Sequence, residues 1–145
     1  MKQDIVCTVS LKINASKSRV WDALINPEKI AKYFFGTKAT SDWKVGSSLT
    51  FSGEWEGKSY EDKGTILQME KEKIFQYDYW SNFSGQPDAP ENYQTITYTL
   101  KEDGANTIFT VTQENCKTEE AQKHSEKNWN MLLGSMKEML EKREI

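Results

Sequence analysis

Residues that build metal sites and cross-links are scarce in this sequence. Its 145 residues include one histidine, two cysteines and three prolines. With a single histidine and no pair of cysteines two residues apart, a metal site of the usual His/Cys kind is nearly excluded. Cys7 and Cys116 are distant in the sequence, and we interpret both as reduced structural thiols. We therefore predict no metal and no cofactor.

The sequence also lacks an excess of positive charge and any long apolar run. The net charge is −3, and lysine and glutamate alternate without a basic stripe, which argues against a nucleic acid as the main partner. No apolar run approaches the roughly 20 residues that cross a bilayer, and residues 1–4 lack the apolar segment of a secretory signal. We expect a cytoplasmic protein without a membrane partner, built as one domain over residues 1–145, and a monomer or weak homodimer.

Aromatic residues, in contrast, are abundant. They make up 12% of the chain, and five of them are tryptophans. Rings bury large areas but pack into irregular spaces, so we expect much of the interior to be filled by rings.

The segment from Thr118 to Ile145 predicts a long amphipathic helix. Thr118 suits an N-cap, and apolar residues recur at helical spacing on one face. That apolar stripe consists of Trp129, Leu133, Met136 and Leu140, flanked by Leu132 and Met139. Toward the N-terminus the same face carries Gln122 and Ser125, which are too small or too polar to fill an interior. We therefore expect a gap beside the first half of this helix.

The rest of the chain reads mainly as strands. Residues 5–13 alternate between apolar and polar side chains, and two short helices follow, capped by Ser16 and by Asn26 with Pro27. About six further strands then run to Gln113, joined mostly by hairpins, which indicates an antiparallel sheet with one wet face. Residues 81–92 form the only long irregular segment, which we interpret as a loop or flap. Such a sheet curls around the long helix, giving an α+β fold.

Several short motifs resemble a known family. They are Val20-Trp21-Asp22-Ala23-Leu24, Pro27-Glu28, Tyr33-Phe34, Asp42-Trp43-Lys44-Val45-Gly46, Gly64 with Ile66, Phe75-x-Tyr77, Thr107-x-Phe109-x-Val111, and Trp129. In this order they resemble the START-like (SRPBCC) superfamily, and within it the branch named for the activator of heat-shock-protein-90 ATPase. The resemblance covers essentially the whole chain. It departs at Asn128, where the family often has glycine.

The resemblance implies a helix-grip (Bet v-like) fold, in which a curved antiparallel sheet wraps around a long C-terminal helix. Many members hold a small apolar molecule in a cavity between the helix and the sheet. The eukaryotic co-chaperones of the family use such a domain to contact their chaperone.

No set of residues predicts catalysis. His124 lies on the solvent side of the predicted helix, so no serine or cysteine has a basic partner for nucleophilic attack. The carboxylate pairs Glu54/Glu56 and Glu61/Asp62 fall at turns and on wet faces, where we interpret them as solubilising. We predict no catalytic residue.

Binding of a small apolar or aromatic molecule is better supported. Aromatic residues of several strands converge on the helix, and the predicted ligand-binding residues are Phe51, Tyr77, Tyr79, Tyr98, Phe109, Gln122, Ser125, Trp129 and Leu133. Two alternatives stay open. One is a module that contacts a chaperone or another protein through an exposed patch, involving Trp43, Trp55, Trp80 or Met131. The other is an enzyme of the cyclase or hydratase type.

Overall fold

The computed structural model describes residues 5–82 and 84–145, with only the backbone described for Trp55. Its elements follow the predicted order of one strand, two short helices, six strands and a long helix. They are β1 (Cys7–Ile13), α1 (Lys17–Ile25), α2 (Pro27–Tyr33), β2 (Lys38–Ser41), β3 (Ser48–Trp55), β4 (Lys58–Glu70), β5 (Ile74–Ser81), the 3₁₀ turn η1 (Pro90–Asn92), β6 (Gln94–Asp103), β7 (Asn106–Glu114) and α3 (Glu119–Glu141).

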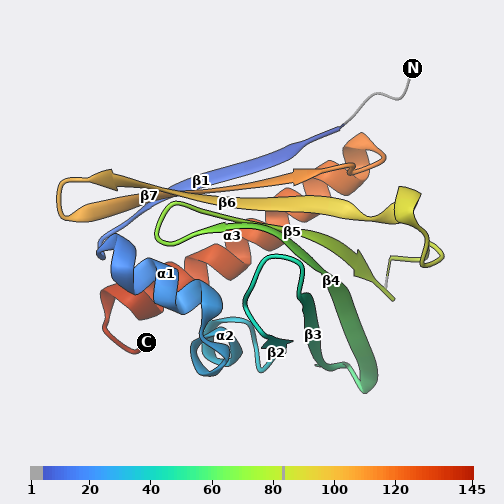
Figure 1. The fold of residues 1–145 in the computed structure, drawn as a ribbon, viewed down its shortest axis with the longest axis horizontal. Helices are drawn as coiled ribbons and strands as arrows, with labels where there is room; N and C mark the ends of the chain where they lie inside the picture. Colours follow the sequence, from blue (N-terminus) through green and yellow to red (C-terminus); the bar gives the residue numbers. More distant parts are fainter. Residues whose placement is uncertain (1–4, 83) are drawn as a thin grey trace.

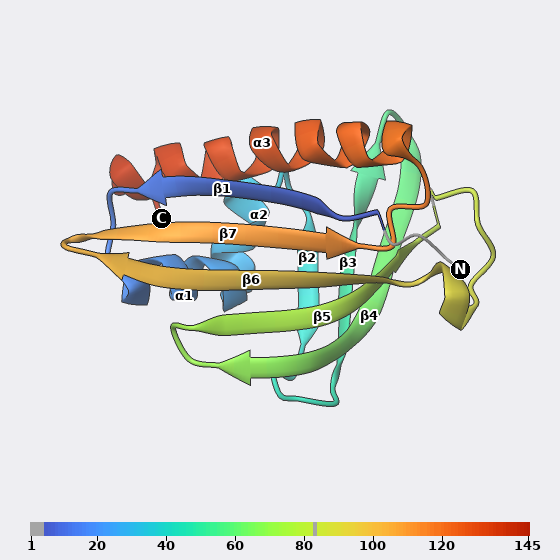
Figure 2. The same ribbon diagram turned by 90° about the horizontal axis from the view of Figure 1, so that it is seen from above.

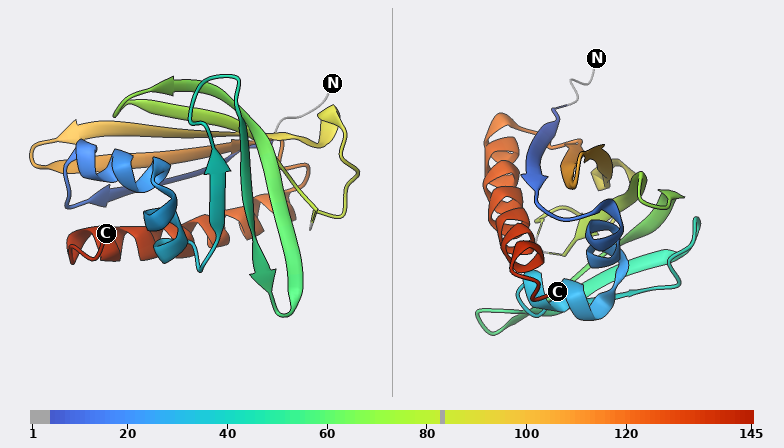
Figure 3. Two further views of the ribbon diagram at one scale, coloured as in Figure 1. Left: turned by 60° about the horizontal axis from the view of Figure 1, so that its bottom comes forward. Right: turned by 90° about the vertical axis from the view of Figure 1, so that its left-hand side faces the viewer.

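The seven described strands form one antiparallel sheet in the order β1-β7-β6-β5-β4-β3-β2. The sheet is strongly twisted, so that β2 and β3 run steeply across the direction of β1 and β7 (Figure 1, Figure 2). Seen from its end, the sheet curls from β1 round to β2 and β3, and α3 lies along the open side (Figure 3, right). The predicted helix-grip fold is therefore confirmed.

Strand β4 carries much of the curvature. Its register against β5 shifts between Ile66 and Gln68, which marks a β-bulge. Nearby, Gly64 lies so close to β5 that a Cβ atom there would be 1.7 Å from the backbone oxygen of Asp78. Only glycine fits at this point, so Gly64 lets the two strands approach where the sheet bends.

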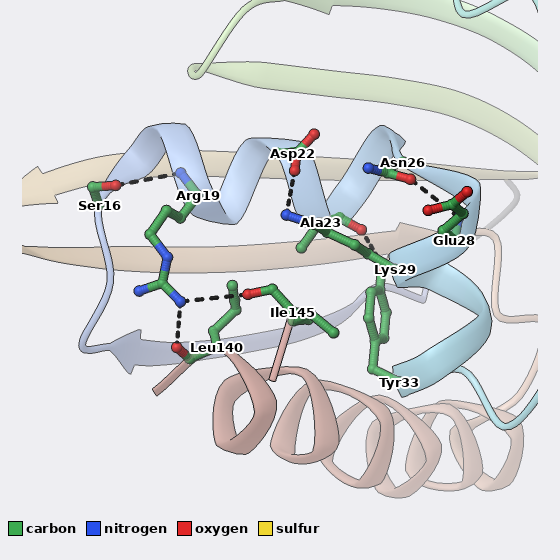
Figure 4. A network of polar contacts seen from close by, with 10 residues as sticks. All are labelled: Ser16, Arg19, Asp22, Ala23, Asn26, Glu28, Lys29, Tyr33, Leu140 and Ile145. Carbon is green, nitrogen blue, oxygen red and sulfur yellow. Dashed lines mark hydrogen bonds and ion pairs between the residues drawn. The ribbon is translucent and has the colours of Figure 1, made fainter. Parts of the chain in front are cut away.

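The two short helices begin at the predicted caps. The Ser16 hydroxyl accepts a hydrogen bond from the Arg19 amide at 3.3 Å, and the Asn26 side chain accepts one from the Glu28 amide at 3.1 Å (Figure 4). Pro27 follows as the first residue of α2, where its missing N–H leaves no hydrogen bond unmade.

Hydrogen bonds connect α1 to the end of α3 and α2 to α1. The Arg19 guanidinium of α1 donates to the backbone oxygen of Leu140 at 2.6 Å (Figure 4). The Leu140 oxygen also accepts a hydrogen bond from the Arg143 amide at 3.2 Å, and a cation at this end of the helix suits the helix dipole. The Tyr33 hydroxyl of α2 donates to the Ala23 oxygen of α1 at 2.9 Å, which fixes the angle between α1 and α2.

Helix α3 buries the predicted apolar stripe in its second half. Leu132, Leu133, Met136 and Leu140 are buried, whereas Trp129 is half-buried. In its first half, the Gln122 amide donates to the oxygen of Val6, the residue directly before the edge strand β1, at 2.6 Å. Asn128 is exposed, so the departure from the family pattern concerns only the helix surface.

Candidate functional site

A small, partly enclosed space lies between α3, the short helices and the inner face of the sheet. Its free volume is about 10 Å³, close to that of one water molecule. Four of the predicted ligand-binding residues, Phe51, Tyr98, Trp129 and Leu133, belong to its wall. The full lining comprises Leu24, Ile30, Tyr33, Phe34, Trp43, Phe51, Phe75, Tyr98, Trp129, Leu132, Leu133 and Met136. We refer to this space as the inner cavity.

A cluster of aromatic rings forms the sheet side of the inner cavity. Phe75 lies near its centre, with its ring centroid 5.9 Å from that of Tyr98 and 5.4 Å from that of Tyr77. Trp129 meets Tyr98 edge to face at 5.9 Å, and Phe109 packs against Tyr98 at 5.3 Å. Tyr77 and Phe109 thus support the wall from behind, because strand alternation sends both side chains to the inner face.

Two buried hydroxyls share a single hydrogen bond inside this cluster. The hydroxyl oxygens of Tyr77 and Tyr98 are 2.8 Å apart, and either can be the donor. One hydroxyl proton of the pair therefore has no acceptor among the described residues. Burial raises the pKa of both phenols, so both stay neutral at physiological pH.

The half-buried indole of Trp129 is held by a chain of amides. Its Nε1–H donates to Gln113 Oε1 at 2.7 Å, and Gln113 Nε2 donates to Gln94 Oε1 at 2.8 Å. Neither glutamine is among the site residues predicted from the sequence. The sequence does indicate that Gln113 faces inward, because it lies two residues after Val111 and four after Phe109 on the same strand.

Asp62 corrects one prediction. We interpreted the Glu61/Asp62 pair as solubilising, which is wrong for Asp62, since only 7% of its surface is exposed. Asp62, Gly64 and Ile66 are spaced two residues apart, so they share the inner face of β4, and this spacing in the sequence indicates that Asp62 is buried. Only the register and curvature of the sheet reveal how deeply it lies.

The carboxylate of Asp62 is only partly satisfied. The Tyr79 hydroxyl donates to its Oδ2 at 2.6 Å, whereas its Oδ1 has no hydrogen-bond partner in the described part of the chain. Burial raises the pKa of this carboxyl, and the neighbouring hydroxyls of Ser81 and Tyr79 partly offset the effect. Tyr79, a predicted site residue, therefore positions a carboxylate and does not line the inner cavity.

Gln122 and Ser125 do not line the inner cavity. The Gln122 side chain is long enough to reach the backbone just before the edge strand β1, where it binds the Val6 oxygen. The free space accordingly lies beside the later turns of α3, from Trp129 to Met136, and not beside its first turns.

Residues 84–92 fold back toward the outer face of β4 and β5. Asp88 pairs with Lys63 at 2.5 Å and accepts a hydrogen bond from Tyr93 at 2.7 Å. The Trp80 indole donates to the Gln86 oxygen at 3.2 Å. None of the described residues of the predicted flap, 81–92, lines the inner cavity.

Other parts of the described surface provide weaker candidates for a functional site. His124 is exposed, as predicted. The described residues hold no group of three His, Cys, Asp or Glu side chains that would share a metal ion.

A second hollow, of about 650 Å³, lies away from the inner cavity, between α1 and the end of β4. Its lining mixes charged and apolar side chains. Among the helices of residues 5–82 and 84–145, none combines the length and the hydropathy needed to span a bilayer.

Exposed apolar side chains are few. The large ones among the described residues are Phe35, Val45, Leu67 and Met131. Of the surface residues named from the sequence, Met131 is 57% exposed, whereas Trp43 and Trp80 are half-buried. The side chain of Trp55 lies outside the described part of the chain.

The sequence profile of one family, described as "Activator of Hsp90 ATPase homolog 1-like protein", matches residues 14–141. A solution structure of ChR145 from Cytophaga hutchinsonii is 48% identical and superposes with a TM-score of 0.86, covering 99% of this chain and 98% of that one. No curated protein matches the chain.

Two more distant structures share the fold. The solution structure of the Aha1 dimer from Colwellia psychrerythraea is 18% identical, with a TM-score of 0.74 over 94% of this chain and 96% of that one. CalU16 from Micromonospora echinospora is 15% identical, with a TM-score of 0.75 over 95% of this chain and 85% of that one.

Proposed function

This chain belongs to the Activator of Hsp90 ATPase homolog 1-like family of the START-like superfamily, and on that basis we propose that it is a non-catalytic small-molecule binding module. Its ligand is an apolar or aromatic molecule held between α3 and the sheet. The observation that carries the proposal is the inner cavity, a partly enclosed space lined by rings and aliphatic side chains.

The tyrosine pair behind the wall supports this function. A hydroxyl proton without an acceptor in an apolar interior costs on the order of 1–3 kcal/mol, and phenylalanine would avoid that cost. Tyr98 lines the cavity and shares its hydrogen bond with Tyr77, and either hydroxyl can be the donor, so the spare proton lies in the cavity wall or directly beside it. A polar atom on a bound molecule would accept it.

A free volume of about 10 Å³ admits no drug-sized molecule, so the wall must open for binding. The segment between α2 and β3 is the part best suited to move. It contributes Phe34 and Trp43, both half-buried, and its strand β2 is four residues long and lies at the edge of the sheet, next to β3. Phe35 and Trp43 have positive φ values of 52° and 58°, a conformation that side chains rarely adopt and that outward movement would relax.

Native mass spectrometry of freshly purified protein tests the proposal, and a co-purified small molecule is the expected result. In parallel, 4-methylanisole is added to ¹⁵N-labelled protein. The indole N–H signal of Trp129 should shift, because this group lies in the cavity wall. Met131→Ser, on the exposed face of α3, is the matched control and should bind the probe as the wild type does. A spectrum unchanged by the probe, together with no co-purified molecule, would contradict the binding function.

A protein-interaction function is the second candidate. Phe35 and Val45 are 55% and 62% exposed, and both lie on the segment between α2 and β3. A contiguous exposed apolar patch is typical of a contact surface, and these two side chains would form part of one. The partner would be a chaperone or a second copy of the chain. Sedimentation of the wild type and of a Phe35→Ser/Val45→Ser variant tests self-association, which the variant should weaken.

A further inference from the structure

Asp62 stands next to the inner cavity on the same face of the sheet. It is the direct partner of Phe51 in the pairing of β3 with β4, and Phe51 belongs to the cavity wall. Paired residues of neighbouring strands project their side chains to the same side, about 5 Å apart. The Asp62 carboxylate therefore lies inside the grip and beside the rings, although the sequence suggested a solvent-facing position.

The buried threonine and glutamine side chains of the described chain have their hydrogen bonds. Thr107 donates to the Ala15 oxygen at 2.8 Å, Thr37 bonds to Tyr60, and Gln113 uses both ends of its amide. Asp62 Oδ1 is the exception among the described residues. Its neighbour along the inner face, Gly64, has no side chain to offer and no room for one.

An unpaired carboxylate oxygen in a protein interior is costly, and folded proteins rarely keep one without a function. A leucine or an asparagine at position 62 would avoid the charge. The hydrogen bond from Tyr79 holds Oδ2 in place, so the orientation of the free oxygen is fixed before any ligand arrives. Such a preorganised acceptor discriminates strongly between molecules that carry a donor and molecules that do not.

We propose that Asp62 is the recognition group of the inner cavity, and that it selects apolar or aromatic ligands whose polar end is an O–H or N–H donor. The donor of the ligand binds Asp62 Oδ1, and Tyr79 positions the carboxylate through Oδ2. This inference rests on the proposed binding function and names the ligand class of the same site.

Two probes of similar shape test it. p-Cresol carries a phenolic O–H, whereas its methyl ether, 4-methylanisole, carries an oxygen without a proton. Each is titrated into ¹⁵N-labelled protein at pH 7, and the dissociation constants are taken from the shift of the Trp129 indole signal. The wild type should bind p-cresol about tenfold more tightly than the ether, which is the effect of one hydrogen bond to a charged group.

Asp62→Asn replaces one carboxylate oxygen by an N–H₂ donor and keeps an acceptor for Tyr79. In this variant the preference for p-cresol should disappear, while 4-methylanisole still binds. Glu61→Gln makes the same chemical change at the exposed neighbouring residue and should keep the wild-type preference.

The possible results separate the two proposals. Equal affinity of the wild type for both probes would overturn the role of Asp62 and leave the binding function standing. The absence of binding by either probe would overturn both. If Asp62→Asn does not fold, the ratio measured on the wild type alone still decides, because a ratio near one contradicts the inference.

Discussion

The hydroxyl oxygens of Tyr77 and Tyr98 lie 2.8 Å apart in the middle of a ring cluster, and both side chains are buried. They come from adjacent strands, β5 and β6, and their rings meet edge to face with centroids 5.7 Å apart. The two hydroxyls depend on each other, because neither has another hydrogen-bond partner among the described residues.

This dependence predicts a strong non-additivity. Tyr77→Phe or Tyr98→Phe alone leaves the other hydroxyl unpaired in the core, and each should lower the free energy of unfolding by about 1–2 kcal/mol. The double variant removes both polar groups and should be no less stable than either single variant. Urea denaturation of the four proteins measures the coupling. Single effects that simply add would show that the hydroxyls act independently.

Trp129 should stabilise the fold through the hydrogen bond of its indole N–H as well as through the buried surface of its ring. Trp129→Phe keeps a ring but leaves Gln113 Oε1 without its donor, so we expect a loss of about 1–2 kcal/mol. Trp129→Ala also removes the packing and should cost about 3 kcal/mol. Trp80→Phe is the control, because the Trp80 indole bonds to a loop oxygen at the surface. A control effect as large as that of Trp129→Phe would contradict this account.

Asp62 should make stability depend on pH in an unusual direction. Its pKa in the folded protein is raised by burial above the ordinary 3.8, so the folded state binds the proton more tightly than the unfolded chain does. The stabilisation from protonation is complete below pH 3.8 and is lost as the pH rises through the folded-state pKa. Relative to Asp62→Asn, the wild type should therefore gain stability as the pH falls from neutral toward 3.8.

The measurement is urea denaturation of both proteins across this pH range, with Glu61→Gln as an exposed control that should parallel the wild type. A wild type that loses stability relative to Asp62→Asn on acidification would show that the carboxylate is stabilised in the fold.

Gly64 and Gly134 should respond oppositely to alanine. At Gly64 the new Cβ would meet the Asp78 oxygen at 1.7 Å, so β4 and β5 must separate, and we expect a loss of about 3 kcal/mol or more. Gly134 lies in α3 with nothing within 4 Å of its Cβ position, and alanine there should add about 0.5–1 kcal/mol. Thermal unfolding of both variants checks the pair. A Gly64→Ala variant as stable as the wild type would contradict the close approach.

Cys7 and Cys116 should both be reduced thiols that react only on unfolding. Both are buried and unbridged, and burial together with the nearby Cys116 raises the pKa of Cys7. A raised pKa lowers the thiolate fraction, which is the reactive form. Thiol titration without reductant should find two groups in denaturant and slow reaction in the native protein. Finding none in denaturant would indicate a disulfide.

Local patterns in the sequence determined the order of the elements and the faces of most of them. Alternation sends Phe109 and Val111 inward whatever the rest of the chain does, and Ser16 and Asn26 cap their helices through atoms two or three residues away. These features depend on backbone geometry over a few residues, so they are readable from the sequence alone.

The tertiary structure decided the polar contacts and the place of the free space. Asp62 is buried because the curl of the sheet and the register of β4 against β3 turn it toward the interior beside Phe51, and Trp129 meets Gln113 because β7 lies opposite α3. Gln122 binds the edge of β1, while the later turns of α3 face the cavity. Each outcome depends on strand register, sheet curvature and the summed volumes of side chains from distant segments, and no local pattern encodes those quantities.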